Sequence, residues 1–299
     1  MSIDQKAMIV KLHISAWKGR KKDDRVTAKT NLDHGAKDGA GVYHKHLLAK
    51  KHLASVQQAE SAARAFHQRN TLPWKDGGDR LLPSKNFLRY NKGMRDLKQR
   101  FENAVAKFLN QYPSLVTDAK QVLGSMYQKT EYPNTTEIED YFKFFTDIEP
   151  VPVADDFRVQ LNELEVKKIK KEIEDRNIRD QKEANKDLWQ RIYSGVKAMA
   201  DGMSDETDAT GKILKKGRVY DAYVNNLKSL AEILPDLNID DDPNLNKMAK
   251  EVKDSLTQHT PGQLRKDATL KQDTAQKAQE IIDKMAGYTG LGGGVGNVQ

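Results

Sequence analysis

Lys and Arg side chains are concentrated in the first 112 residues of this 299-residue chain. That stretch holds 23 Lys and Arg against 10 Asp and Glu, whereas the remainder holds 27 against 33. Four rings, those of Trp17, Tyr43, Trp74 and Tyr90, stand within two residues of a Lys or Arg. Cations neutralise phosphates and flat rings stack on unpaired bases, so this combination predicts sequence-tolerant binding of single-stranded nucleic acid. The alternative is that the rings belong to the core and the charges to solvated faces.

Charge and aromatic placement together select the candidate contact residues. The cations would neutralise phosphates and the rings would stack on bases. The candidate cations are Lys18, Arg20, Lys21, Lys22, Arg25, Lys37, Lys45, Lys50, Lys75, Arg80, Lys85, Arg89, Lys92 and Arg95, and the candidate rings are Trp17, Tyr43, Trp74 and Tyr90.

Histidine is also enriched in the basic part of the chain, which holds six of the seven His residues. His44 and His46 would face one side only in an extended segment, and neither Cys nor a close carboxylate pair completes a metal shell.

Cysteine is absent, so disulfides and thiolate catalysis are excluded. Residues 34–41 are glycine-rich but lack the Gly-Lys-Ser/Thr ending of a phosphate-binding P-loop. We therefore expect a protein with no metal, no cofactor and no catalytic site.

The segment 238–243, with the sequence NIDDDP, is an acidic loop. Its spacing does not match the calcium-binding loop of an EF-hand. We expect it to cap a helix that begins near Asn244.

Two segments have the composition of strands. Along residues 7–17, Val10, Leu12 and Ile14 alternate with polar positions that include His13 and Ser15, which is typical of a half-buried strand. Residues 141–153 are aromatic and β-branched and end in two prolines. We expect these two strands to pair.

The rest of the chain is mostly helical in pattern. Residues 70–83 and 202–217 are expected to be loops, and Pro235 a turn. The expected helices cover residues 46–70, 85–111, a short stretch from Pro113 to about Gly124, 162–199, 219–234 and a segment from about Asn244.

These patterns predict an α+β protein that is mostly helical, with a small sheet and a long helix near residues 162–199. We expect a basic nucleic-acid-binding region at 1–155, a helical assembly region at 156–285 and a flexible Gly-rich tail at 286–299. The middle of the long helix is almost entirely charged, which suggests a partner helix from another copy in a homo-oligomer. The N-terminus lacks the apolar run of a signal peptide, and no segment reaches the roughly 18 apolar residues of a membrane helix. The pattern is typical of a soluble intracellular protein.

Several segments, taken in order, resemble a phage-encoded family of single-stranded DNA-binding proteins from lytic podoviruses, which serve as cofactors of a phage RNA polymerase. The resemblance extends to about residue 246. It implies binding of single-stranded DNA, self-assembly along it, and a role in phage replication, recombination or transcription in the cytoplasm of the infected host. The segments are ISAWKGRKKD (14–23), HGAKDGAGVYHKHLL (34–48), NTLPWKDGGDRLLPSKNFLRY (70–90), LGSMYQKTEYP (123–133), PVPVADDFRVQL (150–161), DLWQRIY (187–193) and ILPDLNIDDDPNLN (233–246).

The chain departs from this functional class at its end, which is Gly-rich and neutral where such proteins often carry an acidic tail that recruits partners. Recruitment of partners such as a phage RNA polymerase or replication proteins through the tail is therefore not expected. Two other functions fit the same pattern: a helical scaffold protein whose basic end docks on acidic protein, and a nuclease or annealing-type recombinase.

Overall fold

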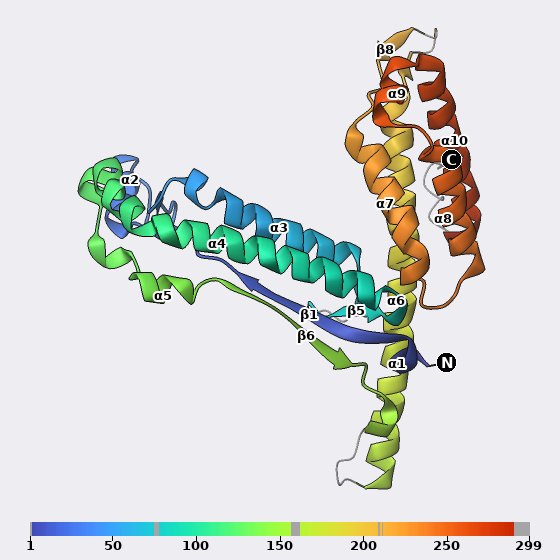
Figure 1. The fold of residues 1–299 in the computed structure, drawn as a ribbon, viewed down its shortest axis with the longest axis horizontal. Coiled ribbons are helices and arrows are strands. Elements are labelled where there is room, and N and C mark those ends of the chain that lie inside the picture. The colour runs from blue at the N-terminus through green and yellow to red at the C-terminus, as the bar shows by residue number, and fades with distance from the viewer. Residues whose placement is uncertain (1, 75–77, 157–161, 209, 211, 290–299) are drawn as a thin grey trace. The chain divides into compact units, whose positions relative to one another are not determined.

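The computed structural model describes residues 2–74, 78–156, 162–208, 210 and 212–289. The fold is α+β and mostly helical, as predicted, with a small antiparallel sheet and one long helix (Figure 1). The long helix, α6, spans Glu163–Met203 and confirms the helix expected near 162–199. It begins where the Asn162 side chain accepts a hydrogen bond from the backbone N–H of Glu165, a standard N-terminal cap.

The residues form two compact units. Unit 1 comprises Met1–Lys11, Gln68–Leu88 and Ile148–Gln299, and unit 2 comprises Leu12–His67 and Arg89–Asp147. The last boundary between the units lies at residues 147–148, close to the predicted end of the basic region at 155, but neither unit is one continuous stretch of sequence. Two N-terminal segments instead pack with the C-terminal half of the chain in unit 1.

The main sheet has the strand order β4-β5-β1-β6. Strands β1 (Ala7–Ser15) and β6 (Lys143–Pro150) are neighbours, which confirms both predicted strands and their pairing. Strands β4 (Leu72–Pro73) and β5 (Arg80–Pro83) lie in the segment expected to be a loop. They are too short to show a period-2 pattern, and Pro73 is tolerated in β4 because β4 is an outer strand of the sheet.

Unit 1 is built around a helical bundle. Its core includes Leu188, Ile192, Val196 and Met199 of α6, all buried. Helices α7 and α10 pack along α6, and α8 packs on α7. The helices of unit 1 besides α6 are α1 (Ile3–Lys6), α7 (Asp221–Leu237), α8 (Pro243–Leu256), α9 (Pro261–Lys266) and α10 (Ala268–Thr289).

The bundle corrects several expectations for the C-terminal half. Buried residues of α6 begin at Ala184, so helices of the same chain cover its second half, and no partner copy is needed there. Pro235 lies inside α7 rather than at a turn. The expected loop 202–217 contains a hairpin of β7 (Glu206–Thr207) and β8 (Ile213–Lys215). Helix α10 runs through residue 289, so it includes the start of the expected tail, and residues 290–299 lie outside the described part of the chain.

Unit 2 contains most of α4 (Phe87–Leu123), a 37-residue helix. Its buried stripe includes Met94, Phe101 and Phe108, at helical spacing. Pro113, expected to start a new helix, lies within α4, because the apolar face packs on both sides of the lost hydrogen bond. The other elements of unit 2 are β2 (Arg20–Lys22), α2 (Asp24–Asp33), β3 (His44–His46), α3 (Ala54–Arg69) and α5 (Thr135–Glu139).

Helix α3 begins eight residues later than expected because residues 44–46 pair with β2 as a strand. Short 3₁₀ turns complete the described chain at Lys50–His52, Ser84–Asn86, Gly124–Met126, Lys129–Glu131 and Ala154–Asp156.

Candidate nucleic-acid interface

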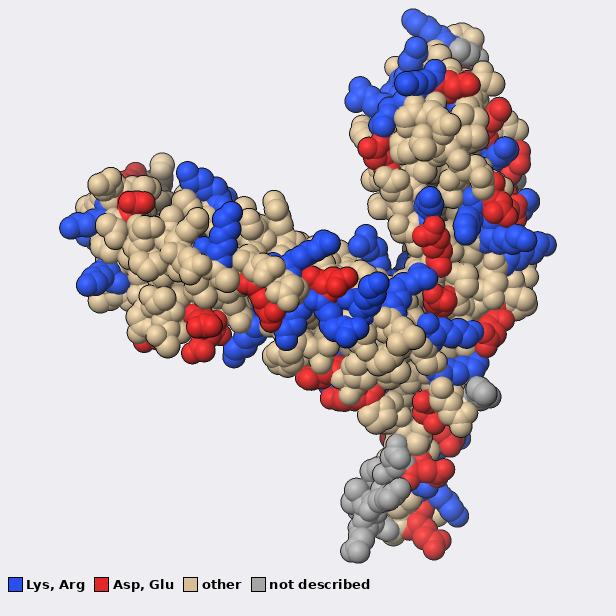
Figure 2. All heavy atoms as spheres, viewed as in Figure 1, with Lys and Arg blue, Asp and Glu red and all other residues tan. Residues whose placement is uncertain are grey.

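The net charge of the protein lies entirely in unit 2. The two segments of unit 2 contain 20 Lys and Arg against 13 Asp and Glu, a balance of +7, whereas unit 1 contains 30 of each. On the face drawn in Figure 2, Lys and Arg side chains lie along α3 and α4 with Asp and Glu between them. Any long-range electrostatic attraction for a polyanion would therefore come from unit 2.

A two-stranded ribbon, β2 paired with β3, carries a cluster of basic groups. Arg20 lies opposite His46 and Lys22 opposite His44 in an antiparallel register. Side chains alternate between the two faces of a strand, so these four groups share one face of the ribbon, and all four are exposed. Lys22 also forms an exposed ion pair with Asp24 at 2.7 Å. The outer face of the ribbon is thus available to an anionic ligand.

The inner face of the ribbon holds Lys45, which is 1% exposed. Its Nζ lies 3.2 Å from Asp23 Oδ2 and 2.8 Å from Glu131 Oε2, and it donates to the backbone oxygen of Met126 at 2.7 Å. Burial acts to lower the pKa of Lys45, but hydrogen bonds and charge from Glu131 and Asp23 outweigh it and raise the pKa above its usual value. The prediction that Lys45 neutralises phosphate is wrong, because this ammonium is already paired inside unit 2.

Asp23 serves two elements at once. Its side chain accepts a hydrogen bond from the backbone N–H of Val26 at 3.0 Å and so caps α2. That hydrogen bond, followed by the interaction with Lys45, holds the pKa of Asp23 below its usual value although burial opposes the shift. The buried ion pair therefore fixes the ribbon against the start of α2.

Most other predicted cations of unit 2 are exposed. Arg25 donates to the backbone oxygen of Ser125 at 3.0 Å, and Arg89 is exposed on α4. Among these remaining predicted cations, the exposed ones for which the described residues supply no ion pair include Lys18, Lys21, Lys37, Lys50, Lys92 and Arg95.

A groove of about 580 Å³ lies on the Lys21 side of the ribbon. Its lining includes Glu131, Glu137 and Asp140 as well as Tyr141. Three carboxylates against one ammonium make this groove unfavourable for a polyanion. The outer face of the ribbon, where Arg20, Lys22, His44 and His46 are exposed, is electrostatically more favourable for an anion than this groove.

The remaining predicted cations belong to unit 1 or lie outside the described residues. Arg80 donates from Nε to Thr71 Oγ1 at 2.9 Å and from Nη2 to the backbone oxygens of Gln68 and Thr71, near the end of α3. Burial, and then the charge of Arg191, lower the pKa of Arg80 below its usual value. Arg80 is therefore engaged with backbone oxygens, as cations at helix C-termini often are, and its assignment to phosphate is corrected. Lys75 lies outside the described residues.

Three of the four predicted stacking rings are buried. Trp17 is 8% exposed and packs edge-on against Tyr112, with ring centroids 5.8 Å apart. Trp74 is 1% exposed, and Tyr90 is fully buried with its hydroxyl 2.7 Å from His67 Nδ1. Burial raises the pKa of Tyr90 above its usual range. The rings of Trp17, Trp74 and Tyr90 offer no free face to a base, so their assignment to base stacking is wrong.

Other rings of unit 2 are exposed. Tyr43, the fourth predicted ring, is exposed beside the ribbon, and its backbone accepts from the N–H of Asp23 at 3.0 Å. Tyr141 and Phe145 are also exposed, and neither was among the predicted rings. The alternation of the strand at 143–150 was the available signal, because Phe144 is buried and its neighbour must then face outward.

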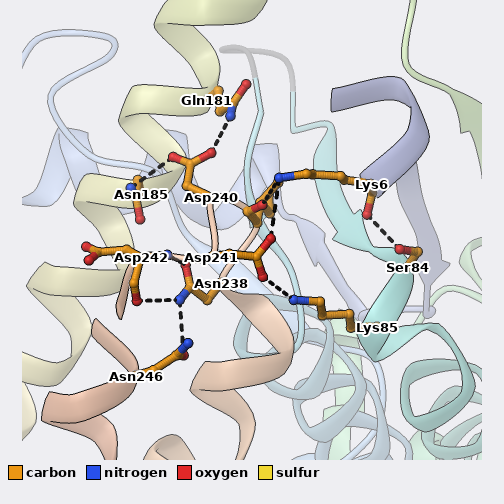
Figure 3. Close-up of polar contacts among 11 residues, drawn as sticks. Lys6, Ser84, Lys85, Gln181, Asn185, Asn238, Asp240, Asp241, Asp242 and Asn246 are labelled. Atoms are coloured by element: carbon orange, nitrogen blue, oxygen red, sulfur yellow. Dashed lines mark hydrogen bonds and ion pairs between the residues drawn. The ribbon is translucent and has the colours of Figure 1, made fainter. Parts of the chain in front are cut away.

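The carboxylates of the acidic loop after α7 are engaged by donors within unit 1 (Figure 3). Asp240 accepts hydrogen bonds from Gln181 and Asn185 of α6. Asp241 pairs with Lys85 and with Lys6, and these contacts, with Lys85 first, lower its pKa below the usual value. Lys85 is exposed in this ion pair, and its assignment to phosphate stays a prediction.

Asp242 confirms the predicted helix cap. Its side chain accepts from the N–H of Asn244 at 2.9 Å at the start of α8, and it also accepts from Trp189 Nε1 at 3.2 Å. Asn238 holds the loop closed by donating to the backbone oxygen of Asp242 and to Asn246 Oδ1 (Figure 3). The loop therefore joins three chain segments of unit 1 to each other.

Among the described residues, no three His, Asp or Glu side chains lie together in a way that could hold a metal ion. In the same part of the chain, no helix combines the length and apolar character needed to cross a membrane.

Comparison with known proteins gives a family without a known function. No curated protein and no solved structure matches the chain. One family model, described as "Protein of unknown function (DUF3150)", matches residues 5–215. The match includes all of unit 2 and ends at the last residue of β8, before helices α7 to α10. Because the match covers well over half of the sequence, the chain belongs to the DUF3150 family.

Proposed function

We propose that this protein binds single-stranded DNA without sequence preference, through the exposed cations of unit 2, and that it does so without catalysis. The observation that carries the proposal is the +7 balance of unit 2 beside the neutral unit 1. Contacts from flexible Lys and Arg side chains to phosphates position a strand but do not read its sequence.

The outer face of the β2–β3 ribbon is the proposed centre of this surface. It presents Arg20 and Lys22 with His44 and His46, and Lys18 lies just before it in the chain. Each phosphate neutralised on a single strand releases about 0.7 of a counterion, so binding would weaken steadily with added salt. Exposed Tyr43 lies next to the ribbon, where its ring is accessible to an unpaired base.

The biological setting of the proposal comes from the resemblance to the phage single-stranded DNA-binding proteins. A protein of that kind would coat DNA during replication, recombination or transcription in the cytoplasm of an infected bacterium. Its partners would be further copies of itself and a phage RNA polymerase or replication proteins.

Self-assembly is part of the proposal, and the first half of α6 is its support. None of the residues 163–183 is buried, and Leu164 and Ile178 are large apolar side chains exposed on that stretch. These two residues are two heptads apart and so lie on nearly the same side of the helix. A helix from a second copy would cover this side.

A charge-reversal experiment tests the binding proposal. Lys18, Arg20 and Lys22 are all replaced by Glu, and a control chain carries Glu at Lys247, Lys250 and Lys253, which are exposed on α8 in unit 1. Both variants change the net charge by the same amount. Fluorescence anisotropy with a labelled single-stranded oligonucleotide is measured over a salt series.

We expect the unit 2 variant to lose about 2 units of log–log salt slope, since three contacts of about 0.7 each are removed, and the unit 1 variant to keep the original slope. Equal effects of the two variants would show that only total charge matters and would refute the assigned surface.

A further inference from the structure

The open face of the β1–β6 strand pair in unit 2 carries two aromatic groups. Ile14 and Phe144 are buried on the opposite face, where Phe144 packs on Phe101 of α4 with ring centroids 5.6 Å apart. Strand alternation then places His13 and Phe145 on the open face, and both are exposed. This arrangement follows from the alternation of side chains between the two faces of a strand.

The two rings form a parallel stack. Their centroids lie 4.6 Å apart with an interplanar angle of 11°. Phe145 is 45% exposed, so the stack stands out from the sheet instead of packing beneath a neighbour. His13 Nε2 lies 3.1 Å from Asp147 Oδ2, which holds the imidazole in the plane that the stack requires. The rings are thus ordered before any ligand binds, and a ligand that stacks on them avoids that ordering cost.

The surroundings of the stack are polar and include the Asp147 carboxylate and one cation. Lys143 is exposed two residues before Phe145 on the same face of β6. The Ser15 hydroxyl donates to the backbone oxygen of Tyr141 at 3.0 Å, which fixes the start of β6, and the Tyr141 ring is itself exposed. A hydrophobic peptide would need a continuous apolar patch, whereas a nucleobase needs a flat ring face with polar groups at its edge.

We propose that the His13–Phe145 stack is the base-stacking site of this protein, where an unpaired base of single-stranded DNA adds to the existing pair of rings. The proposal rests on the proposed function and names the part of unit 2 that distinguishes an unpaired base from a duplex. It takes the place of the buried rings of Trp17, Trp74 and Tyr90. The +7 balance of the same unit attracts the phosphates of the strand, and the ring stack holds a base.

A ring-removal experiment tests this site. Phe145→Leu removes the ring but keeps an apolar side chain on an exposed position, and Phe145→Tyr keeps the ring. Tyr220→Leu is the matched control, because Tyr220 is similarly exposed, at 51%, but belongs to unit 1. Affinity for a single-stranded oligonucleotide is measured over a salt series, together with quenching of a 2-aminopurine base in that strand. Thermal melting confirms that each variant is folded.

We expect Phe145→Leu to weaken single-strand binding by about fivefold to 100-fold, the effect of losing one stacked base, with the salt slope unchanged. The 2-aminopurine quenching should fall in the same variant and stay in Phe145→Tyr and Tyr220→Leu. If Phe145→Leu binds and quenches like the unmodified chain while binding stays salt-dependent, the stacking site is wrong and the proposed function stands. If the unmodified chain shows no salt-dependent binding of single strands, both are overturned.

Discussion

Lys45 shows how one buried charge organises unit 2. Its ammonium has left water and is compensated by the Asp23 and Glu131 carboxylates and by a backbone oxygen. Such a pair adds little net stability over an apolar replacement, but removing one partner leaves the other charges buried without compensation. The ribbon that presents Arg20 and Lys22 therefore depends on a residue that does not itself contact solvent.

Replacing Lys45 by Met should destabilise the protein by roughly 3–5 kcal/mol, because two buried carboxylates lose their counter-charge. Urea unfolding measured by circular dichroism gives the change. The triple variant Lys45→Met, Asp23→Asn, Glu131→Gln should recover part of the loss, since no buried charge remains. If the single variant Lys45→Met were as stable as the original chain, the claim that Lys45 compensates two buried carboxylates would be contradicted.

The same pair predicts a pH dependence. The pKa of Asp23 is lowered in the folded protein, so its contribution to stability is present above the unfolded value of 3.8 and is lost as the pH falls through the folded value. The pKa of Lys45 is raised, so its contribution is present below 10.5 and is lost as the pH rises through the folded value.

Urea unfolding at a series of pH values should therefore show that Asp23→Asn removes part of the acid loss of stability. The neighbouring Asp24→Asn serves as control, because Asp24 lies in an exposed ion pair that contributes little. If the free energy of unfolding fell with decreasing pH in the same way for Asp23→Asn and for the original chain, the stabilising role of the Asp23 carboxylate would be contradicted.

At the scale of elements, the packing of α3 on α4 depends on one glycine. A Cβ at Gly93 would lie 2.2 Å from Cζ of the Phe66 ring. Alanine in a helix interior usually gains about 0.5–1 kcal/mol over glycine. Here the added methyl group has no room, so the sign of the effect should reverse.

We expect Gly93→Ala to cost roughly 1–3 kcal/mol, the range for overpacked sites. Differential scanning calorimetry measures the shift in melting temperature. Adding Phe66→Leu to Gly93→Ala should restore part of the loss by making space. A rise in melting temperature for Gly93→Ala alone would show that the helices lie farther apart than the structure gives.

The acidic loop gives a second test at this scale. Asp242→Ala removes the cap of α8 and the acceptor of Trp189 Nε1, so it should lower stability by about 1 kcal/mol or somewhat more. Asp242→Asn is the control, because asparagine caps helices about as well as aspartate. Denaturation followed by tryptophan fluorescence reports the change, and equal losses for both variants would argue against the cap.

Elements with a long, regular pattern could be predicted from the sequence. Strands β1 and β6, their pairing and helix α6 have clear periods, and the structure contains all three. Pro113 and Pro235 were expected to interrupt helices, but each lies within one, because tertiary packing on both sides outweighs the lost hydrogen bond. Trp17 and Trp74 stand beside cations in sequence, yet linear neighbours do not show which ring the core covers.

At the scale of the whole molecule, each compact unit is made of segments that are separated along the chain. Unit 1 takes residues 68–88 from the middle of the basic stretch, and with them Arg80 and Lys85. A border read along the sequence could not separate these cations from those of unit 2, since the separation arises from long-range packing. When the residues are divided between the two units, the net positive charge belongs to unit 2 alone.

The prediction of self-assembly rests on the first half of α6. Analytical ultracentrifugation of the DNA-free chain at micromolar concentration should show a homo-oligomer, because residues 163–183 present Leu164 and Ile178 without a covering helix. Replacing both residues by Lys should shift the protein toward monomer. A monomer at low and moderate salt, with no larger species on adding a long oligonucleotide, would remove the assembly role of this helix.

The central claim is that unit 2 attracts a single strand by charge and prefers it to a duplex because unpaired bases reach exposed rings. Its most direct test is the binding of the unmodified chain to a single-stranded oligonucleotide and to a duplex of equal length over a salt series. We predict tighter binding of the single strand, with an affinity that falls linearly on a log–log plot by about 0.7 per phosphate neutralised. Affinity that does not change with salt, or a duplex bound as tightly as the single strand, would contradict the account.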